Sequence, residues 1–308
     1  MARNIQNKVA ESKLTLPVLA CYTFAVWNMV GDWTQERWLL LICLGLTTYL
    51  MMVMNNVHAL LRIYSRMISG AFLALMCCAC FPFSSLEDAV MQLCFAAFLL
   101  VWFTTYQDKT TAGRTYYAFL LLGIASLTFS QLLYLLPMIW LLSATNIMSM
   151  SWRTCTASFL GLLTPYWFEG CWLFYKGDFT PLTEHVSALH EFGPMLQWEL
   201  LDTPEIMTLG FFILLTITSI VHLLRKYYLD KIRTRMFYGC FCWLNILAIT
   251  FIILQPQHYR PLMLVSCVCT APLIGHFLAL TTTRMTNIAS IAIAILSLAI
   301  TLYNVWTS

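Results

Sequence analysis

Two ionisable side chains stand in stretches that are otherwise apolar, and they are the first candidates for chemistry. Glu169 lies in the segment Pro165–Gly170, and His276 closely follows Pro272 and Gly275. A carboxylate or an imidazole inside a membrane is costly, so such groups mark ion or substrate paths by default. Proline and glycine so close together can loosen a helix and free carbonyl groups, as binding sites in transporters require. We therefore expect Glu169 and His276 to bind a substrate.

Each of these residues also has an ordinary structural explanation. Glu169 is close to the end of its apolar segment, where a carboxylate can reach the aqueous interface. A neutral histidine hydrogen-bonded to a neighbouring helix would account for His276. His222 is near the predicted cytoplasmic end of its segment and is expected at the interface. Four amide side chains are expected to hydrogen-bond between helices, namely Asn28, Gln131, Asn146 and Asn245.

A second group of candidates consists of acids in two short polar turns. Asp32 lies in the turn Gly31–Arg37, and Glu87 and Asp88 follow a pair of serines. These acids predict a site for a cation or a polar substrate on the outer side of a membrane. Serine followed by acids is also ordinary helix N-capping, so both interpretations stand at this point.

The composition decides what kind of chain carries these residues. Of the 308 residues, 60% are apolar and only 10% are charged, and the mean hydropathy is +0.75. Soluble domains have ~45–50% apolar and ~25% charged residues, so soluble enzymes, nucleic-acid binders, disordered chains and secreted disulfide scaffolds are excluded. The 12 cysteines fall almost wholly within apolar segments, which argues against a disulfide framework. No phosphate-binding glycine loop occurs, so neither a nucleotide nor another cofactor is expected.

The apolar segments between the charges are the helices that must position these side chains. A bilayer core is ~30 Å thick and needs ~20 apolar helical residues. The uncharged stretch between Arg114 and Arg153 would reach ~57 Å as one helix, so a hairpin of two helices with its turn at Ser130–Gln131 is expected. The predicted spans are 14–30, 38–54, 67–83, 89–106, 116–129, 132–149, 154–175, 207–224, 236–254, 261–280 and 288–306, about eleven in all.

The positions of lysine and arginine orient these spans. With the N-terminus inside, fourteen of the 17 basic residues fall in cytoplasmic segments, and only Arg37, Lys176 and Arg260 fall outside. The predicted fold is an all-α polytopic transmembrane helix bundle, a single domain over 1–308 with a cytoplasmic N-terminus and an outer C-terminus. Its expected parts are a cytoplasmic N-terminal segment 1–13, an outer amphipathic loop 177–206 and a basic inner loop 225–235 that contacts anionic headgroups.

This layout resembles a group of uncharacterised bacterial multi-pass inner-membrane proteins of about this length. The shared features are the short basic N-terminus, the helical hairpin before Trp152–Arg153, the late outer loop and the inner turn Lys231–Arg235. The resemblance implies a location in the bacterial inner membrane.

The acids in the first two outer turns more distantly resemble the GT-C glycosyltransferases, which use polyprenyl-phosphate sugars. That resemblance implies that Asp32 is the base or metal ligand and that Glu87 or Asp88 is an auxiliary catalytic group. The turn 31–37 departs from the family pattern, because it is short and lacks an adjacent acidic pair.

We therefore expect a protein of cell-envelope biogenesis that handles a lipid-linked glycan or a lipid, and whether it is an enzyme stays open. One alternative is a secondary transporter of a small molecule or ion with Glu169 and His276 near its path. Another is a non-catalytic partner in membrane-protein assembly. The expected partners are membrane lipids, a lipid-linked sugar and another membrane protein, with no nucleic acid, nucleotide or metal.

Overall fold

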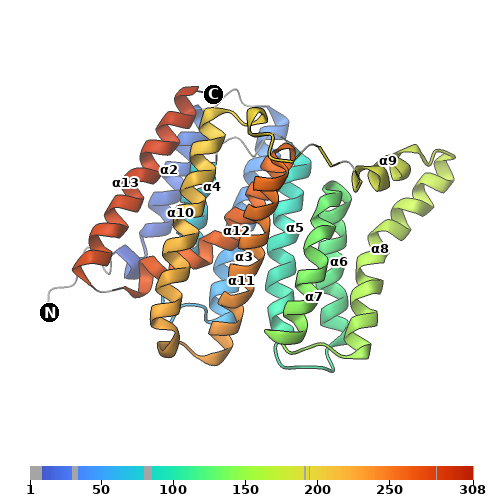
Figure 1. The fold of residues 1–308 in the computed structure, drawn as a ribbon, viewed down its shortest axis with the longest axis horizontal. Helices are drawn as coiled ribbons and strands as arrows, with labels where there is room; N and C mark the ends of the chain where they lie inside the picture. Colours follow the sequence, from blue (N-terminus) through green and yellow to red (C-terminus); the bar gives the residue numbers. More distant parts are fainter. Residues whose placement is uncertain are drawn as a thin grey trace.

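A computed structural model describes residues 9–29, 34–79, 85–190, 192–193, 195–281 and 283–307 of the chain. About 85% of the chain is helical, and no strand occurs in the described ranges. The predicted all-α fold class is therefore confirmed. The helices form a bundle, from which the far end of α8 and the short α9 project to one side (Figure 1).

The α-helices follow one another with short connections, some of them 3₁₀ turns. The α-helices are α2 (Thr15–Met29), α3 (Gln35–His58), α4 (Met67–Cys78), α5 (Leu86–Trp102), α6 (Ala112–Thr128), α7 (Leu136–Thr145), α8 (Trp152–Lys176), α9 (Thr180–Ala188), α10 (Thr203–Lys226), α11 (Ile232–Leu254), α12 (Tyr259–Leu280) and α13 (Arg284–Thr307). The 3₁₀ turns are η1 (Phe103–Thr105), η2 (Ser130–Leu135), η3 (Trp198–Leu200), η4 (Tyr227–Leu229) and η5 (Pro256–His258).

Each predicted span overlaps one of these α-helices. The one α-helix in this list without a predicted span is α9, which falls in the predicted outer loop. Within the described ranges, six helical segments are long and apolar enough to cross a membrane: Gln35–His58, Leu86–Thr105, Thr203–Lys226, Ile232–Leu254, Pro256–Leu280 and Arg284–Thr307. Shorter apolar helices cover Thr15–Met29, Met67–Cys78 and Ser130–Thr145. Several long apolar helices thus give the chain the character of a membrane protein.

The long uncharged stretch before Arg153 is broken, as its length predicts. α6 ends at Thr128, and the chain turns through η2 into α7. Gln131 fixes the turn by donating from Nε2 to the carbonyl oxygen of Ala188 at 3.0 Å. Trp140 of α7 donates from Nε1 to Ser158 Oγ of α8 at 3.2 Å. The predicted hairpin is therefore confirmed as two helices rather than one.

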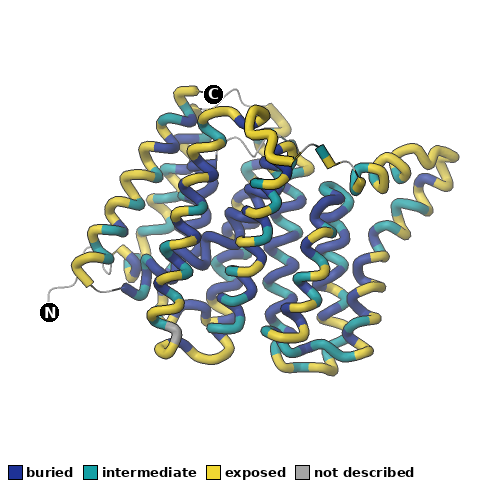
Figure 2. Tube along the Cα trace, viewed as in Figure 1, coloured by how far each residue is buried: buried dark blue, intermediate teal, exposed yellow. Residues whose placement is uncertain are grey.

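α12 lies at the centre of the bundle and packs against α4, α5, α10 and α11. The most apolar stretch of this helix is 94% buried inside the protein, whereas the corresponding stretch of α13 is 17% buried. Figure 2 shows the same contrast between the dark interior and the exposed outer turns of α13. The predicted loosening at Pro272 does not interrupt α12, which runs on to Leu280. Gly275 instead allows close packing, because a Cβ there would lie 3.0 Å from Cγ1 of Ile68 on α4.

α6 and α8 pack with unusually close backbones, and two glycines make this possible. A Cβ on Gly161 would meet the carbonyl oxygen of Tyr116, and a Cβ on Gly123 would lie 2.8 Å from the carbonyl oxygen of Leu162. Small residues at such crossings are typical of membrane helices, since close packing replaces the hydrophobic driving force that lipid removes. The projecting helix α8 is thus attached through α6.

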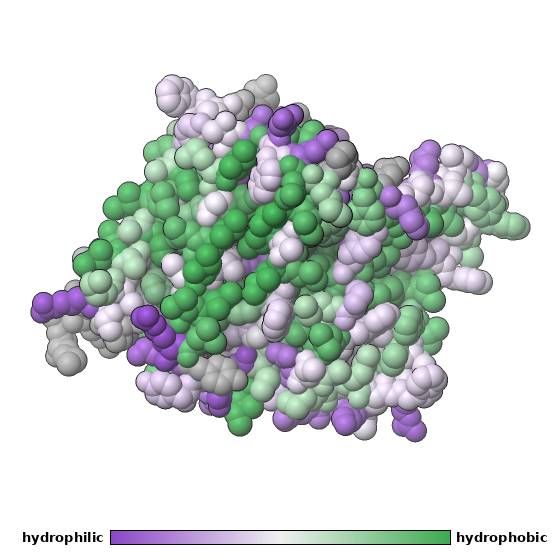
Figure 3. Space-filling view, in the orientation of Figure 1, coloured by the Kyte–Doolittle hydropathy of each residue, from purple (hydrophilic) through white to green (hydrophobic). Residues whose placement is uncertain are grey.

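Most of the basic residues lie in the connections, or in the helix ends beside them, at one edge of the bundle, the lower edge in Figure 1. We call this edge the basic face and define it by the loops 59–66, 105–111, 146–151 and 227–231. The last turn of α13 reaches the opposite edge (Figure 1). Figure 3 shows hydrophilic side chains gathered at both edges and a largely hydrophobic band between them, as a bilayer requires.

Replacing Gly161 by alanine should destabilise the α6–α8 pair, because the new methyl group would meet the Tyr116 carbonyl. We expect the free energy of unfolding to fall by about 1–3 kcal/mol, as for other overpacked sites. Gly170 lies on the same helix with open space around it, so Gly170→Ala is the matched control. Thermal unfolding of the purified variants in detergent measures the difference. Equal melting temperatures for the two variants would contradict the close contact.

Candidate functional site

The acids predicted to be catalytic are only partly visible in the structure. Asp32 lies outside the described residues. Glu87 is exposed in the first turn of α5, and Asp88 beside it is half-buried. Ser85 caps this helix, since its Oγ accepts a hydrogen bond from the Asp88 N–H at 3.2 Å. Acids in the first turn of a capped helix are ordinary, because they face its positive dipole end, and the catalytic role of these two remains a prediction from the resemblance.

Glu169 is half-buried on the face of α8 that also carries the buried Pro165 and Leu173. It forms no hydrogen bond or ion pair with the described part of the chain. The neighbouring Tyr166 hydroxyl lies 2.8 Å from Ser126 Oγ and 3.3 Å from His185 Nε2. Because α8 packs on α6, Glu169 is separated from the central helix that carries His276.

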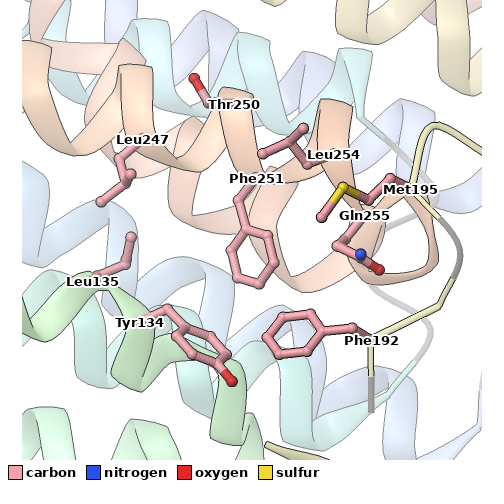
Figure 4. Close-up of a pocket in the computed structure, with 9 residues that line it drawn as sticks. All are labelled: Tyr134, Leu135, Phe192, Met195, Leu247, Thr250, Phe251, Leu254 and Gln255. Carbon is pink, nitrogen blue, oxygen red and sulfur yellow. The ribbon is translucent and has the colours of Figure 1, made fainter. Parts of the chain in front are cut away.

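An apolar pocket of about 240 Å³ lies between η2, α11 and the loop before η3. Figure 4 shows the rings of Tyr134, Phe192 and Phe251 turned toward one another across it. Its lining consists of Tyr134, Leu135, Phe192, Met195, Leu247, Thr250, Phe251, Leu254 and Gln255. None of the predicted site residues lines this pocket, and it carries no ionisable acid or base apart from the Tyr134 phenol.

The strongest concentration of buried ionisable groups surrounds His276. The His276 side chain is fully buried, and its Nε2 lies 3.1 Å from Oδ2 of Asp230, which is itself 2% exposed. The other carboxylate oxygen of Asp230 lies 3.0 Å from Nε of Arg62. An ionised carboxylate only accepts hydrogen bonds, so His276 carries a proton on Nε2. Three elements distant in sequence thus meet in one Arg–Asp–His cluster.

The loop after α3 places Arg62 in this cluster. Asn55 holds the loop by donating from Nδ2 to the Ser65 carbonyl at 2.9 Å and by accepting from the Leu61 N–H at 3.2 Å. Arg62 also donates from Nη1 to the Leu229 carbonyl at 3.4 Å, next to Asp230. These contacts join the connection between α3 and α4 to the turn between α10 and α11. The basic face is therefore built around a buried acid.

Two further rings enclose His276. The ring centroid of Tyr238 lies 4.7 Å from that of His276, and the centroid of His222 lies 5.4 Å away. Nδ1 of His276 and Nε2 of His222 are buried and have no hydrogen-bond partner among the described residues. The His222 side chain turns inward onto α12 and is 8% exposed, and its predicted place at the cytoplasmic interface stays a prediction.

The environment of Asp230 keeps this buried acid ionised. Burial raises the pKa of its carboxyl, but the hydrogen bond from His276 and the positive charge of Arg62 lower the pKa further, to below its ordinary value. The Arg62 side chain is 35% exposed and connects the pair to solvent at the basic face. The cluster thus presents a charged, buried proton acceptor with one route to water.

Sequence reasoning found His276 but missed its partner. Asp230 stands among Arg225, Lys226, Lys231 and Arg233, where an acid looks like ordinary surface charge. The one available signal was that Asp230 is the single acid in the predicted inner loop 225–235. The predicted headgroup contact of that loop is untested, and its acid points into the protein.

The predicted outer loop holds the short helix α9 and the turn η3. Thr203 is the first residue of α10, and the Ile206 N–H donates to the Asp202 carbonyl at 3.0 Å. Among the described residues, no group of three His, Cys, Asp or Glu side chains is placed to hold a metal ion.

Removal of Arg62 should destabilise the protein more than removal of the whole ion pair. Arg62→Met leaves the Asp230 carboxylate buried without its cation, and we expect unfolding to become easier by about 1–3 kcal/mol, below the ~3–5 kcal/mol of a fully buried pair because Arg62 is partly exposed. Adding Asp230→Asn to this variant should restore most of the loss. Denaturation of the single and double variants in detergent gives the coupling energy. An additive effect of the two substitutions would show that the ion pair contributes nothing.

No known protein family, curated protein or solved structure matches this chain, so its function must be inferred from this cluster and its surroundings.

Proposed function

We propose that the protein is a secondary transporter that moves protons through a multi-pass membrane domain, with His276 and Asp230 as its protonation site. The observation that supports this proposal is the fully buried imidazole of His276 on the central helix α12, which is hydrogen-bonded to the buried carboxylate of Asp230 in the turn before α11. Ionisable groups at such positions are costly and are retained in pumps and transporters as proton relays.

The chemistry of the pair suits proton transfer. Imidazole is the side chain whose ordinary pKa lies nearest to neutrality, and its two nitrogens can accept a proton on one side while releasing one on the other. Asp230 orients the ring through Nε2, which leaves the buried Nδ1 to receive a proton. Arg62 at the basic face stabilises the ionised acid between transfers.

The orientation that we propose places the basic face in the cytoplasm and the C-terminus outside, with eleven crossings in a bacterial inner membrane. Its support is the excess of lysine and arginine in the connections of one edge, which is the ordinary signature of cytoplasmic loops. Odd numbers of crossings put the two ends of a chain on opposite sides. Glu169 would then lie near the outer end of α8, away from the proton site.

Handling of a lipid-linked glycan or a lipid remains the prediction that the sequence favours. The GT-C-like role of Asp32 rests on resemblance alone, and Glu87 and Asp88 lie in the first turn of a helix that Ser85 caps, where acids are ordinary. The buried His276 cluster has no counterpart in that hypothesis, and so it favours transport.

Replacing His276 by glutamine should abolish proton movement while the fold survives. Glutamine retains a donor for Asp230 but cannot exchange protons, and we expect the rate to fall about a hundredfold. Purified protein in liposomes that contain a pH-sensitive dye is exposed to a pH gradient, alone and then with amino acids, sugars and inorganic ions in turn. His185→Gln, on α9, is the matched control and should retain full activity. If wild-type liposomes are no faster than protein-free ones under every condition, the proposed function is wrong.

The proposed topology predicts which residues an impermeant maleimide can reach. Ser187→Cys should react in right-side-out membrane vesicles, whereas Lys231→Cys should react only after permeabilisation. Both positions are exposed in the structure, and the wild-type chain reports the background from its own cysteines. Reaction of both variants from the same side would exclude this arrangement.

A further inference from the structure

A line of buried polar side chains extends from His276 into the middle of the bundle, on three helices that pack together. We call this line the polar seam: it consists of Thr216, Ser219 and His222 on α10, Tyr238 and Asn245 on α11, and Ser266, Thr270 and His276 on α12. All eight residues are buried, and the three helices pack against one another. On α10 the residues are three apart and on α11 seven apart, and on α12 Ser266 and Thr270 are four apart, spacings that keep each set on one side of its helix. His276 lies six residues after Thr270 on another side of α12 and is joined to the seam by the rings of His222 and Tyr238.

The inner end of the seam is a bridge between three helices. Asn245 donates from Nδ2 to Thr216 Oγ1 at 2.8 Å and accepts from Ser266 Oγ at 2.7 Å. The predicted interhelical role of Asn245 is therefore confirmed. Asn245 lies about thirteen residues into α11, or ~20 Å from the basic face at ~1.5 Å per residue, which is beyond half of a ~30 Å core.

Between this bridge and Asp230, four buried polar groups lack partners in the described part of the chain. They are Ser219 Oγ, His222 Nε2, Thr270 Oγ1 and His276 Nδ1. A buried hydroxyl or imidazole nitrogen without a hydrogen bond costs about 1–3 kcal/mol, so four of them along one line are not stable as a dry contact. Ordered water is the usual partner of such groups, and each buried water needs two to four polar neighbours.

We infer that the polar seam binds a file of water molecules that conducts protons between His276 and Asn245. This inference rests on the proposed function, since it supplies the route to the same protonation site. The groups that face His276 are Asp230 from the loop before α11, His222 from α10 and Tyr238 from α11. Two positive charges lie one step further away, Arg62 beside Asp230 and Lys226 near His222.

The transfer step conserves protons and involves no redox change. A water of the file gives a proton to Nδ1 of His276, and the Nε2 proton passes to Oδ2 of Asp230. Asp230 then releases that proton to water at the basic face beside Arg62. The water file has then lost one proton, and a proton that enters at its inner end, beside Asn245, replaces it. Rotation of the imidazole ring then restores the starting arrangement, whereas the reverse transfer would return the proton to the water file.

The seam covers only part of the bundle. Beyond Asn245 and Ser266, the next turns of α10 and α12 carry the buried apolar residues Leu209, Phe212, Leu262 and Met263. The water file is therefore a half-path that begins at the basic face and ends inside the bundle. In a transporter, such an end point is where the coupled solute or the second half-path must connect.

Hydroxyl-radical footprinting with short X-ray pulses tests the water file independently of transport. Radicals formed from bound water label the side chains that touch it, so Tyr238 and His276 should be oxidised although they are buried. Phe95 and Phe98 are equally buried in apolar surroundings and should stay unlabelled. If Tyr238 and His276 are as protected as these phenylalanines, there is no water file, whatever the transport assay gives.

Thr270→Val tests whether the file carries protons, because valine keeps the shape and removes the hydroxyl. Proton uptake into liposomes should fall about tenfold or more. Thr48→Val is the matched control, since the Thr48 hydroxyl is buried but bonds only within its own helix to the Leu44 carbonyl. Full uptake by Thr270→Val together with loss in His276→Gln would overturn the path and leave the proposed function intact. Absence of uptake by the wild type would overturn the proposed function and with it the path.

Discussion

The burial of α12 at the centre of the bundle is the constraint on which the rest of the structure depends. A helix surrounded by other helices meets little lipid, so the polar groups along it must be satisfied by neighbouring side chains or by bound water. Ser266 meets Asn245 of α11, and His276 meets Asp230 of the turn that leads into the same helix. On its other side, Gly275 brings α4 into backbone contact. The positions of α4, α10 and α11 are thus fixed by what α12 presents to each of them.

Stability does not explain why a carboxylate is kept at the end of this helix. A buried ion pair is generally no better than well-packed apolar side chains of the same size, because removal from water offsets the attraction between the charges. The loop that carries Asp230 holds enough basic residues to face the cytoplasm without it. The acid also fixes the tautomer of His276, which an apolar residue cannot do. A chemical role for Asp230 and His276 explains both the buried carboxylate and the fixed tautomer of the imidazole.

The helices could be predicted from the sequence, whereas the site could be predicted only in part. Apolar runs and their length give every helix of the bundle, including the break at Ser130, because lipid demands a fixed span of apolar residues. His276 could be predicted as a site residue because an ionisable side chain in an apolar segment is unusual. Asp230 and Arg62 were missed, since both lie in loops where charges are normal and only the packing of α3, α10 and α11 brings them together. The direction of a side chain on its helix, such as the inward turn of His222, likewise depends on neighbours that the sequence does not name.

Pro272 of α12 lies between the seam residues Thr270 and His276. Pro272 has no N–H, so the Val268 carbonyl has no donor from that position, although the helix continues. Val268 lies between Ser266 and Thr270, which are seam residues, and its carbonyl is a further acceptor at the depth where the water file is expected. A missing helix bond also lowers the cost of bending there. Since apolar side chains close the route beyond Ser266, protons can cross the whole membrane only if the bundle rearranges, and the turn between Val268 and Pro272 is where α12 can bend at the least cost.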